Sequence, residues 1–291
     1  MAGSSILLGA CLPSDQERNF KDHTDQEPST APAQEVTAAP VAIDPAILGQ
    51  RTFGEAPILA ERVRAGELPP VSDRLPDEPL VFRPLKQIGV YGGTLRRALL
   101  GDIAEIAGVS KTISDNLMGY ERPLPTGVHL NLAESYDYSD EGRTVTFRIR
   151  KGVRWSDGVP FTVDDILFWY YDVQQNDDAR DVPILESEWM VDGRPIQMEK
   201  VDDHTLRVFS HKPLGRILHS FCSDGSMWPK HFFAPLHPTY EPTATYAEFR
   251  AASTASQRYM KPGMPQLGAW MPVQWVRGQR IVYERNPYYW K

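Results

Sequence analysis

Cysteine is scarce in this 291-residue chain, which carries only Cys11 and Cys222. Two cysteines provide no disulfide framework of the kind that stabilises small secreted domains. The sequence contains no run of eighteen apolar residues, so it predicts no transmembrane helix. An excess of positive charge is also missing, because 31 Lys and Arg stand against 38 Asp and Glu and the net charge is −7. This balance argues against a surface for nucleic acid or anionic membrane.

The common signatures of catalysis and nucleotide binding are missing as well. No G-x-S-x-G, H-E-x-x-H, G-x-G-x-x-G or G-x4-G-K-S/T pattern occurs, so the glycine pair at 92–93 suggests no phosphate loop. Asp164 and Asp165 are adjacent, and neighbouring side chains on a helix point apart, which argues against a catalytic carboxylate pair. Nothing near Cys222 in the sequence would activate its thiol. We expect no enzymatic activity and no cofactor.

Histidine is the one metal-ligating residue type that gathers in the sequence. Five of the seven histidines are His204, His211, His219, His231 and His237. Their spacings place no two of them on one helical turn, so no local zinc motif forms. We therefore expect these histidines to be hydrated or hydrogen-bonded. The alternative is a metal site assembled from scattered loops.

The remaining composition is that of a globular protein with a sizeable core. Hydrophobic residues make up 41% and charged residues 24% of the chain, whose length is sufficient for two domains. Many of the 25 prolines lie in the first ninety residues, where a poorly ordered leader is expected.

Residues 133–173 carry the strongest local pattern. A polar turn at 139–142 precedes a predicted strand over 143–150, in which Val145, Phe147 and Ile149 alternate with threonine and arginine. The period of two predicts one apolar and one basic face. After a second turn at 157–158, Thr162 is placed to cap a helix whose first turn is acidic, followed by apolar residues. The stretch therefore predicts a hairpin, a short strand and a capped helix.

This stretch, with its order T-V-T-F-R-I-R-K-G, V-R-W, S-D-G, P-F-T and D-D, resembles the bacterial extracellular solute-binding proteins of family 5. That is the peptide and nickel class, which supplies ABC importers. An ordinary α+β domain with a hairpin and a helix is the alternative, but it explains residue types rather than identities. The resemblance implies a mixed α/β (α+β) fold built of periplasmic-binding-protein-like class II lobes.

Other segments add to the resemblance or depart from it. The strand expected from Tyr91 toward Leu100, the Pro-Lys-His step at 229–231 and the Asn-Pro-x-Tyr-Trp motif at 286–290 are similar to family features. Residues 265–270 depart from the family's Gly-Thr-Gly-Pro-aromatic turn, which puts transfer of ligand preference in doubt. Short helices are expected over 57–66, 113–120 and 214–221, and a second hairpin over 196–209, with strands at 196–201 and 205–209.

The Asn-Pro-x-Tyr-Trp motif lies near the middle of family members, so the resemblance implies that the C-terminal lobe is missing. Three explanations stay open: the chain is a fragment, a truncated gene product or one piece of a split protein. The implied organisation is a lipoprotein-type leader and tether at 1–46, an extended proline-rich wrap at 47–84, the first lobe at 85–115 and again at 241–291, and a second, inserted lobe at 116–240.

The N-terminus resembles a lipoprotein signal. Leu8 to Ala10 precede Cys11 as small residues precede the acylated cysteine of a lipobox, and a polar, Pro- and Ala-rich tether follows. The segment has no basic residue before a short apolar stretch, so a lone cysteine in an irregular terminus is the alternative. The expected location is the periplasm or cell surface, with a lipid anchor at Cys11.

We therefore expect a monomeric receptor that captures a peptide and delivers it to an ABC permease in the membrane. An oligosaccharide is the alternative ligand, and a non-catalytic scaffold is the alternative class. The resemblance implies Asn116, Tyr120 and Trp189 as candidate ligand contacts, with buried structural roles as the alternative for Asn116 and Tyr120. Tyr91 is a further candidate, because its aromatic ring offers a flat contact surface. Ligand-dependent quenching of tryptophan fluorescence separates a receptor from a scaffold, and turnover of the ligand separates an enzyme from both.

Overall fold

The computed structural model describes residues 42–44, 52–84, 87–98, 113–121, 127–180, 187–223 and 225–291. Every described residue belongs to one compact unit, Ala38–Lys291. Cys11 and most of the expected leader and tether lie outside the described residues. The expected lobe boundaries stay a prediction.

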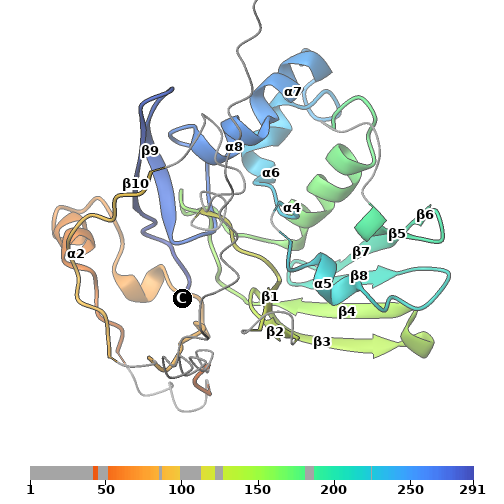
Figure 1. Ribbon diagram of the computed structural model, residues 1–291, viewed down its shortest axis with the longest axis horizontal. Coiled ribbons are helices and arrows are strands. Elements are labelled where there is room, and N and C mark those ends of the chain that lie inside the picture. The colour runs from red at the N-terminus through yellow and green to blue at the C-terminus, as the bar shows by residue number, and fades with distance from the viewer. Residues whose placement is uncertain are drawn as a thin grey trace, which may run out of the picture. The chain divides into compact units, whose positions relative to one another are not determined.

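A four-stranded antiparallel sheet organises the described fold, with strand order β3-β4-β8-β7 (Figure 1). Both predicted hairpins are confirmed and supply these strands, which are β3 Ala133–Ser139, β4 Thr144–Ile149, β7 Gln197–Asp202 and β8 Thr205–Phe209. Pairing of β4 with β8, in which Thr146 lies opposite Arg207, joins the two hairpins into one sheet. Local patterns predicted each hairpin but not this long-range pairing.

Strand β4 confirms the predicted period of two. Val145, Phe147 and Ile149 are fully buried, whereas Arg148 between them is exposed. The apolar face packs into the main hydrophobic cluster, where Phe147 meets Phe221 edge to face at a centroid distance of 5.1 Å. One side of the sheet thus forms the core, as the alternation requires.

The prediction of a continuous basic face is wrong at Arg150, which follows β4 and is buried. Its guanidinium donates hydrogen bonds to the carbonyls of Asn131 (2.8 Å) and Glu78 (3.0 Å) and lies 5.7 Å from the ring centroid of Trp290. These partners explain how a cation is buried without a carboxylate beside it. Burial lowers the pKa of Arg150, while the more distant Glu134 and Glu78 carboxylates oppose that shift.

The capped helix is confirmed at its start. Helix α4, Val163–Leu167, begins with a capping box, because the Thr162 hydroxyl accepts from backbone N–H groups and the Asp165 carboxylate accepts from the N–H of Thr162. The helix continues as a π-helical segment, η3 Phe168–Gln174. All the apolar side chains expected on this face are buried: Ile166, Phe168, Trp169, Tyr170 and Val173.

The segment before the sheet is mostly irregular. Helix α2, Pro57–Arg64, is confirmed with proline at its first position and Gly66 in the left-handed region just after its end. A single 3-10 turn, η1 Val71–Asp73, interrupts the proline-rich stretch that follows. The strand expected from Tyr91 is wrong over 91–98, which is irregular and exposed in this structure. A strand is stabilised by its neighbours, and residues 91–98 pair with no strand of the described ranges.

The helix expected over 113–120 is wrong as well. Its second half forms strand β1, Met118–Tyr120, which pairs antiparallel with β2, Val128–Leu130. Asp115 explains the failure, since its carboxylate accepts the backbone N–H of Asn116 at 3.1 Å. Such local side-chain bonds offer the backbone an alternative to the helix.

Short elements complete the described fold. The expected helix at 214–221 is confirmed in a shorter form as α5, Ile217–Ser220. The other elements are η2 Asp140–Gly142, η4 Ser187–Trp189, β5 Met190–Val191, β6 Arg194–Pro195, α6 Lys230–Phe233, η5 Ala234–Leu236, α7 Tyr246–Ser253, α8 Ala255–Met260, β9 Trp270–Val276 and β10 Arg280–Arg285. Figure 1 shows α4, α6, α7 and α8 on one side of the sheet and the β9–β10 hairpin apart from it.

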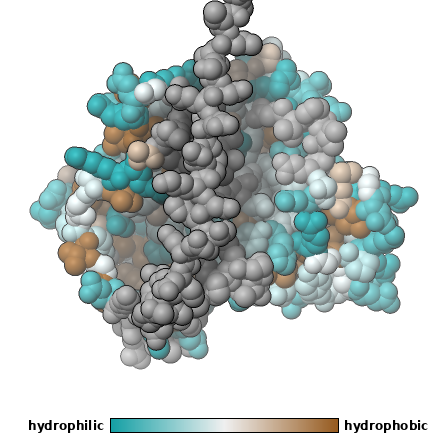
Figure 2. All heavy atoms as spheres, in the orientation of Figure 1, coloured by the Kyte–Doolittle hydropathy of each residue, from teal (hydrophilic) through white to brown (hydrophobic). Residues whose placement is uncertain are grey.

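The surface agrees with the composition. Hydrophilic side chains dominate the coloured atoms on the face shown in Figure 2, with smaller hydrophobic patches between them. In the part of the chain that the structure describes, no helix has the length and apolar character needed to cross a membrane.

Candidate binding pocket

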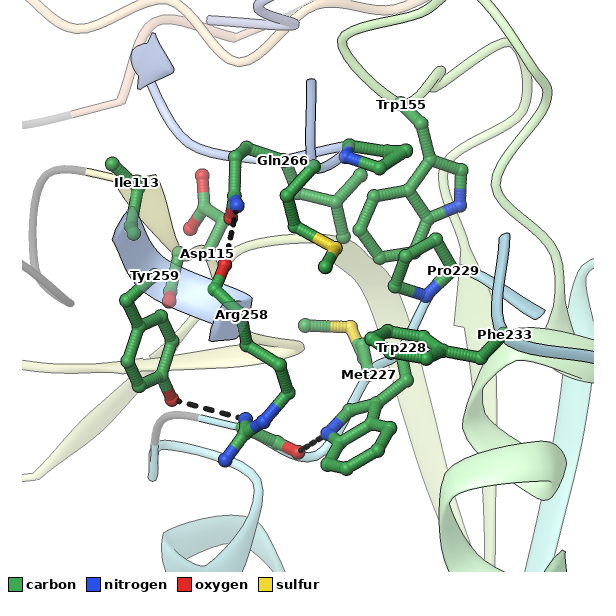
Figure 3. A pocket seen from close by; sticks show the side chains of 15 residues that line it. Ile113, Asp115, Trp155, Met227, Trp228, Pro229, Phe233, Arg258, Tyr259 and Gln266 are labelled. Carbon is green, nitrogen blue, oxygen red and sulfur yellow. Dashed lines mark hydrogen bonds between the residues drawn. The ribbon is translucent and has the colours of Figure 1, made fainter. Parts of the chain in front are cut away.

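A pocket lies where the loop before β1 meets the segments around α6 and α8 (Figure 3). Aromatic and methionine side chains form much of its wall, namely Trp155, Met227, Trp228, Phe233, Tyr259 and Met264. Ile113, Arg258 and Tyr259 stand on one side in Figure 3, opposite Trp155 and Pro229. The cavity volume is about 40 Å³, which holds about three water-sized groups. The pocket as shaped here therefore admits the end of a solute rather than a whole oligomer.

Asp165 positions the two tryptophans of the pocket. Its buried carboxylate accepts hydrogen bonds from Trp155 Nε1 (3.1 Å), from the backbone N–H of Thr162 (3.0 Å) and from the backbone N–H of Lys230 (2.9 Å). Its carbonyl also accepts the N–H of Trp228 at 3.4 Å. Burial raises the pKa of Asp165, while the N–H donors oppose that shift. One residue of the acidic helix start thus joins the turn at 155–158 to the start of α6.

Gln266 joins the opposite wall to the same turn. Its backbone N–H donates to the Ser156 hydroxyl at 3.0 Å, and its carbonyl accepts the N–H of Ser156 at 2.9 Å. The side-chain amide donates to the carbonyl of Arg258 at 2.7 Å. Two residues further on, Gly268 lies directly against the backbone of Ile113 and donates its N–H to that carbonyl at 2.8 Å. These bonds hold segments more than a hundred residues apart around one pocket.

Two charged side chains in the pocket wall, Asp115 and Arg258, differ in the hydrogen bonds and ion pairs that they form within the protein. The Asp115 carboxylate accepts from Asn131 (2.6 Å) and Trp290 Nε1 (3.0 Å) and pairs with Lys291 at 3.1 Å. The Arg258 guanidinium lies over the ring of Trp228 at 4.4 Å, donates from Nε to the carbonyl of Ser253 at 3.0 Å and donates a longer bond to the Tyr259 hydroxyl at 3.4 Å, but pairs with no carboxylate of the described residues. Arg258 is therefore the cation that the pocket offers to a solute, with aromatic faces beside it.

The described residues provide no evident catalytic chemistry. Burial raises the pKa of the Cys222 thiol to about 11, so the thiol stays protonated at neutral pH. Two of the clustered histidines have protein partners, since His231 pairs with Asp157 at 2.8 Å and His237 bonds the carbonyl of Asp172 at 3.0 Å. No group of three His, Cys, Asp or Glu side chains within the described ranges is arranged to hold a metal ion.

The sequence-predicted contacts lie outside the pocket wall. Tyr91 is 57% exposed and Tyr120 is 42% exposed, the latter with its ring 6.2 Å from that of His219. Asn116 is half-buried and donates to the carbonyl of Cys222 at 2.9 Å. Trp189 is buried in an aromatic cluster, 4.9 Å from Trp169. The structure does not bring these four side chains together, and their ligand-binding roles stay predictions.

Sequence reasoning missed the residues that form the pocket. Trp155 ends the V-R-W segment and Trp228 directly precedes the Pro-Lys-His step at 229–231, so a local signal was present for both. Arg258 and Gln266 lie in stretches without a motif. Only the fold brings them to the pocket.

Comparisons with known proteins agree with the geometry. The family model for bacterial extracellular solute-binding proteins, family 5 Middle, matches residues 127–291. The periplasmic alpha-galactoside-binding protein of Rhizobium meliloti (strain 1021) is 32% identical over 275 residues, which cover 83% of this chain and 37% of that protein.

Two solved structures resemble the fold closely. An oligopeptide-binding protein OppA superposes with a TM-score of 0.74 at 32% identity. The periplasmic binding protein MelB from Agrobacterium fabrum C58, in complex with stachyose, superposes with a TM-score of 0.70 at 31% identity. Each alignment covers 82% of this chain and 38% of the other. The chain thus spans well under half the length of the relatives that it matches.

Proposed function

We propose that this chain, which belongs to the bacterial extracellular solute-binding proteins of family 5, is the solute-binding component of an ABC importer. It captures an oligomeric solute, a peptide or an oligosaccharide, without covalent chemistry and delivers it to a membrane permease. The relatives named for oligopeptides and for alpha-galactosides or stachyose support both solute classes.

One observation carries the proposal. The most recognisable family feature, the acidic helix start, uses Asp165 to position Trp155 and Trp228 in the wall of a pocket. Aromatic walls with a few placed polar groups are characteristic of small-molecule sites. Arg258 between Trp228 and Tyr259 adds a donor group that no carboxylate of the described residues neutralises.

The finer parts of the proposal follow from the family. A receptor of this kind acts in the periplasm or at the cell surface as a monomer, held there by a lipid at Cys11. Tyr91, Asn116 and Tyr120 remain proposed contacts, and the two tyrosines offer exposed rings. Trp189 contacts a solute only if the core around it opens, because it is 3% exposed.

Replacing Arg258 by alanine is expected to weaken solute binding by about tenfold or more, since it removes the cation of the pocket and the stacking that holds both rings. Isothermal titration calorimetry with stachyose, raffinose and a mixture of tri- to pentapeptides measures the effect. Arg277→Ala is the matched control, because Arg277 stacks on Trp275 at 4.8 Å away from the pocket. It should bind like the wild type.

Two results would refute this function. Absence of a heat of binding with every solute would favour a scaffold, and conversion of the solute during the titration would favour an enzyme. An equal loss of solute affinity in the Arg258 and Arg277 variants would mean that the pocket has no specific role in binding.

A further inference from the structure

Two exposed aromatic rings converge on one guanidinium outside the pocket. Arg285 at the end of β10 lies 5.5 Å from the ring centroid of Tyr91 and 5.7 Å from that of Trp270. Trp270 opens β9 directly opposite Arg285, whereas Tyr91 comes from a segment far away in the sequence. Tyr91 is 57% and Trp270 40% exposed. We call these three residues the Tyr91–Trp270–Arg285 platform.

The guanidinium of this platform keeps its hydrogen-bonding capacity. Arg285 forms no ion pair with a carboxylate of the described residues, and its guanidinium contacts the two rings instead. A planar guanidinium presents several N–H donors in a fixed fork. Its neighbours present flat, apolar faces that lose little conformational entropy on binding. Trp270 and Arg285 form a cross-strand pair that contributes to the β9–β10 hairpin, but much of the surface of both rings stays open to solvent and to a solute.

The chemistry of the platform matches a sugar ring. A pyranose has an apolar C–H face, which stacks on an aromatic ring, and vicinal hydroxyl oxygens, which accept two parallel N–H donors. Trp270 and Tyr91 supply the first kind of contact and Arg285 the second. A peptide uses a guanidinium chiefly through a carboxylate, and such a contact does not need two exposed rings.

The platform lies near the pocket. Leu267 lines the pocket and Trp270 follows three residues later, so their Cα atoms lie at most about 11 Å apart. Tyr283 of β10 also packs with Tyr259 against Ile113, which lines the pocket. A cavity of about 40 Å³ has no room for a whole oligomer, so most of an oligomer bound there would lie outside the pocket.

We propose that the Tyr91–Trp270–Arg285 platform is a second subsite that stacks a pyranose ring of an oligosaccharide whose end occupies the pocket. This inference rests on the proposed solute-binding function and assigns the solute to the oligosaccharide class. It predicts that affinity depends on the number of sugar rings, because a single ring does not span both subsites.

Trp270→Ala and Arg285→Lys test the platform. Each is expected to lower the affinity for stachyose about tenfold while changing the affinity for methyl α-galactoside less than twofold. Titration calorimetry with both saccharides measures the two affinities. Trp275→Ala is the matched control, because Trp275 lies on the same strand and stacks on Arg277 rather than on Arg285. It should keep the wild-type preference for stachyose, and thermal unfolding checks that all variants fold.

The outcomes separate this inference from the function on which it rests. If the wild type binds stachyose and both platform variants bind it equally well, the platform is wrong and the receptor function stands. If the wild type binds tripeptides but neither saccharide, the oligosaccharide assignment is wrong and the receptor function again stands. If it binds no solute of either class, both proposals are wrong.

Discussion

Replacing Asp165 by alanine is expected to lower the free energy of unfolding by about 4 kcal/mol, because three N–H donors, one in a buried and two in partly buried hydrogen bonds, lose their acceptor. For a domain of this size the melting temperature should fall by about 8–16 °C. The Trp155 indole and the start of α6 also lose their common anchor, so the pocket should lose its shape. Thermal unfolding followed by circular dichroism measures the first effect, and titration with the solute measures the second.

Asp164→Ala is the matched control for that substitution. Asp164 is the adjacent carboxylate, and its partner is Lys200 at 2.6 Å in a solvent-exposed ion pair. Exposed pairs contribute about 0–1 kcal/mol, so the melting temperature should fall by no more than about 4 °C. Similar decreases in melting temperature for the two variants would contradict the role assigned to Asp165. Both carboxylates would then stabilise the helix only through its dipole.

Gly268→Ala is expected to destabilise the fold by about 3 kcal/mol through overpacking. A methyl group on Gly268 would lie 2.4 Å from the carbonyl carbon and 2.6 Å from the carbonyl oxygen of Ile113, and neither backbone atom moves alone. Because Ile113 lines the pocket, relief of this clash should displace the wall and weaken solute binding. Chemical denaturation gives the stability change, and calorimetry on the folded variant gives the affinity.

Gly215→Ala controls for the loss of glycine itself. A Cβ atom at Gly215 would meet nothing within 4 Å, so its free energy of unfolding should change by less than about 0.5 kcal/mol. A Gly268 variant as stable as the Gly215 variant would mean that the close approach to Ile113 is not required.

Local sequence signals predicted the elements whose stabilising contacts lie between residues close together in the sequence. The hairpin at β3–β4 follows from its turn and from the alternation of Val145, Phe147 and Ile149, and the helix follows from the capping box of Thr162. In these segments turn chemistry, periodicity and caps favour the same structure. The apolar residues expected on the helix are accordingly in the core.

The predictions failed where partners distant in the sequence decide the structure. Arg150 continues the alternation, but the carbonyls of Asn131 and Glu78 make its burial possible. Residues 113–120 hold apolar residues at helical spacing, yet Asp115 and the pairing of β1 with β2 give a loop and a strand. No local pattern reports such partners.

Some residues of the candidate site could be recognised from local motifs, and others could not. The family motifs contained Trp155 and Asp165, and Trp228 directly precedes the Pro-Lys-His step, although periodicity alone assigned none of the three a role in a pocket. Arg258, Gln266 and the Tyr91–Trp270–Arg285 platform depend on contacts between segments far apart in the chain. A single sequence contains no signal for such contacts.

Native mass spectrometry tests the central claim most directly, namely that this chain captures an oligomeric solute and leaves it chemically unchanged. The chain is incubated with stachyose or with tri- to pentapeptides in large excess and is then transferred to the gas phase. The proposed function predicts a complex of one solute per chain, from which the solute is released with its original mass. Absence of a complex with every solute, or release of cleaved solute, would contradict it.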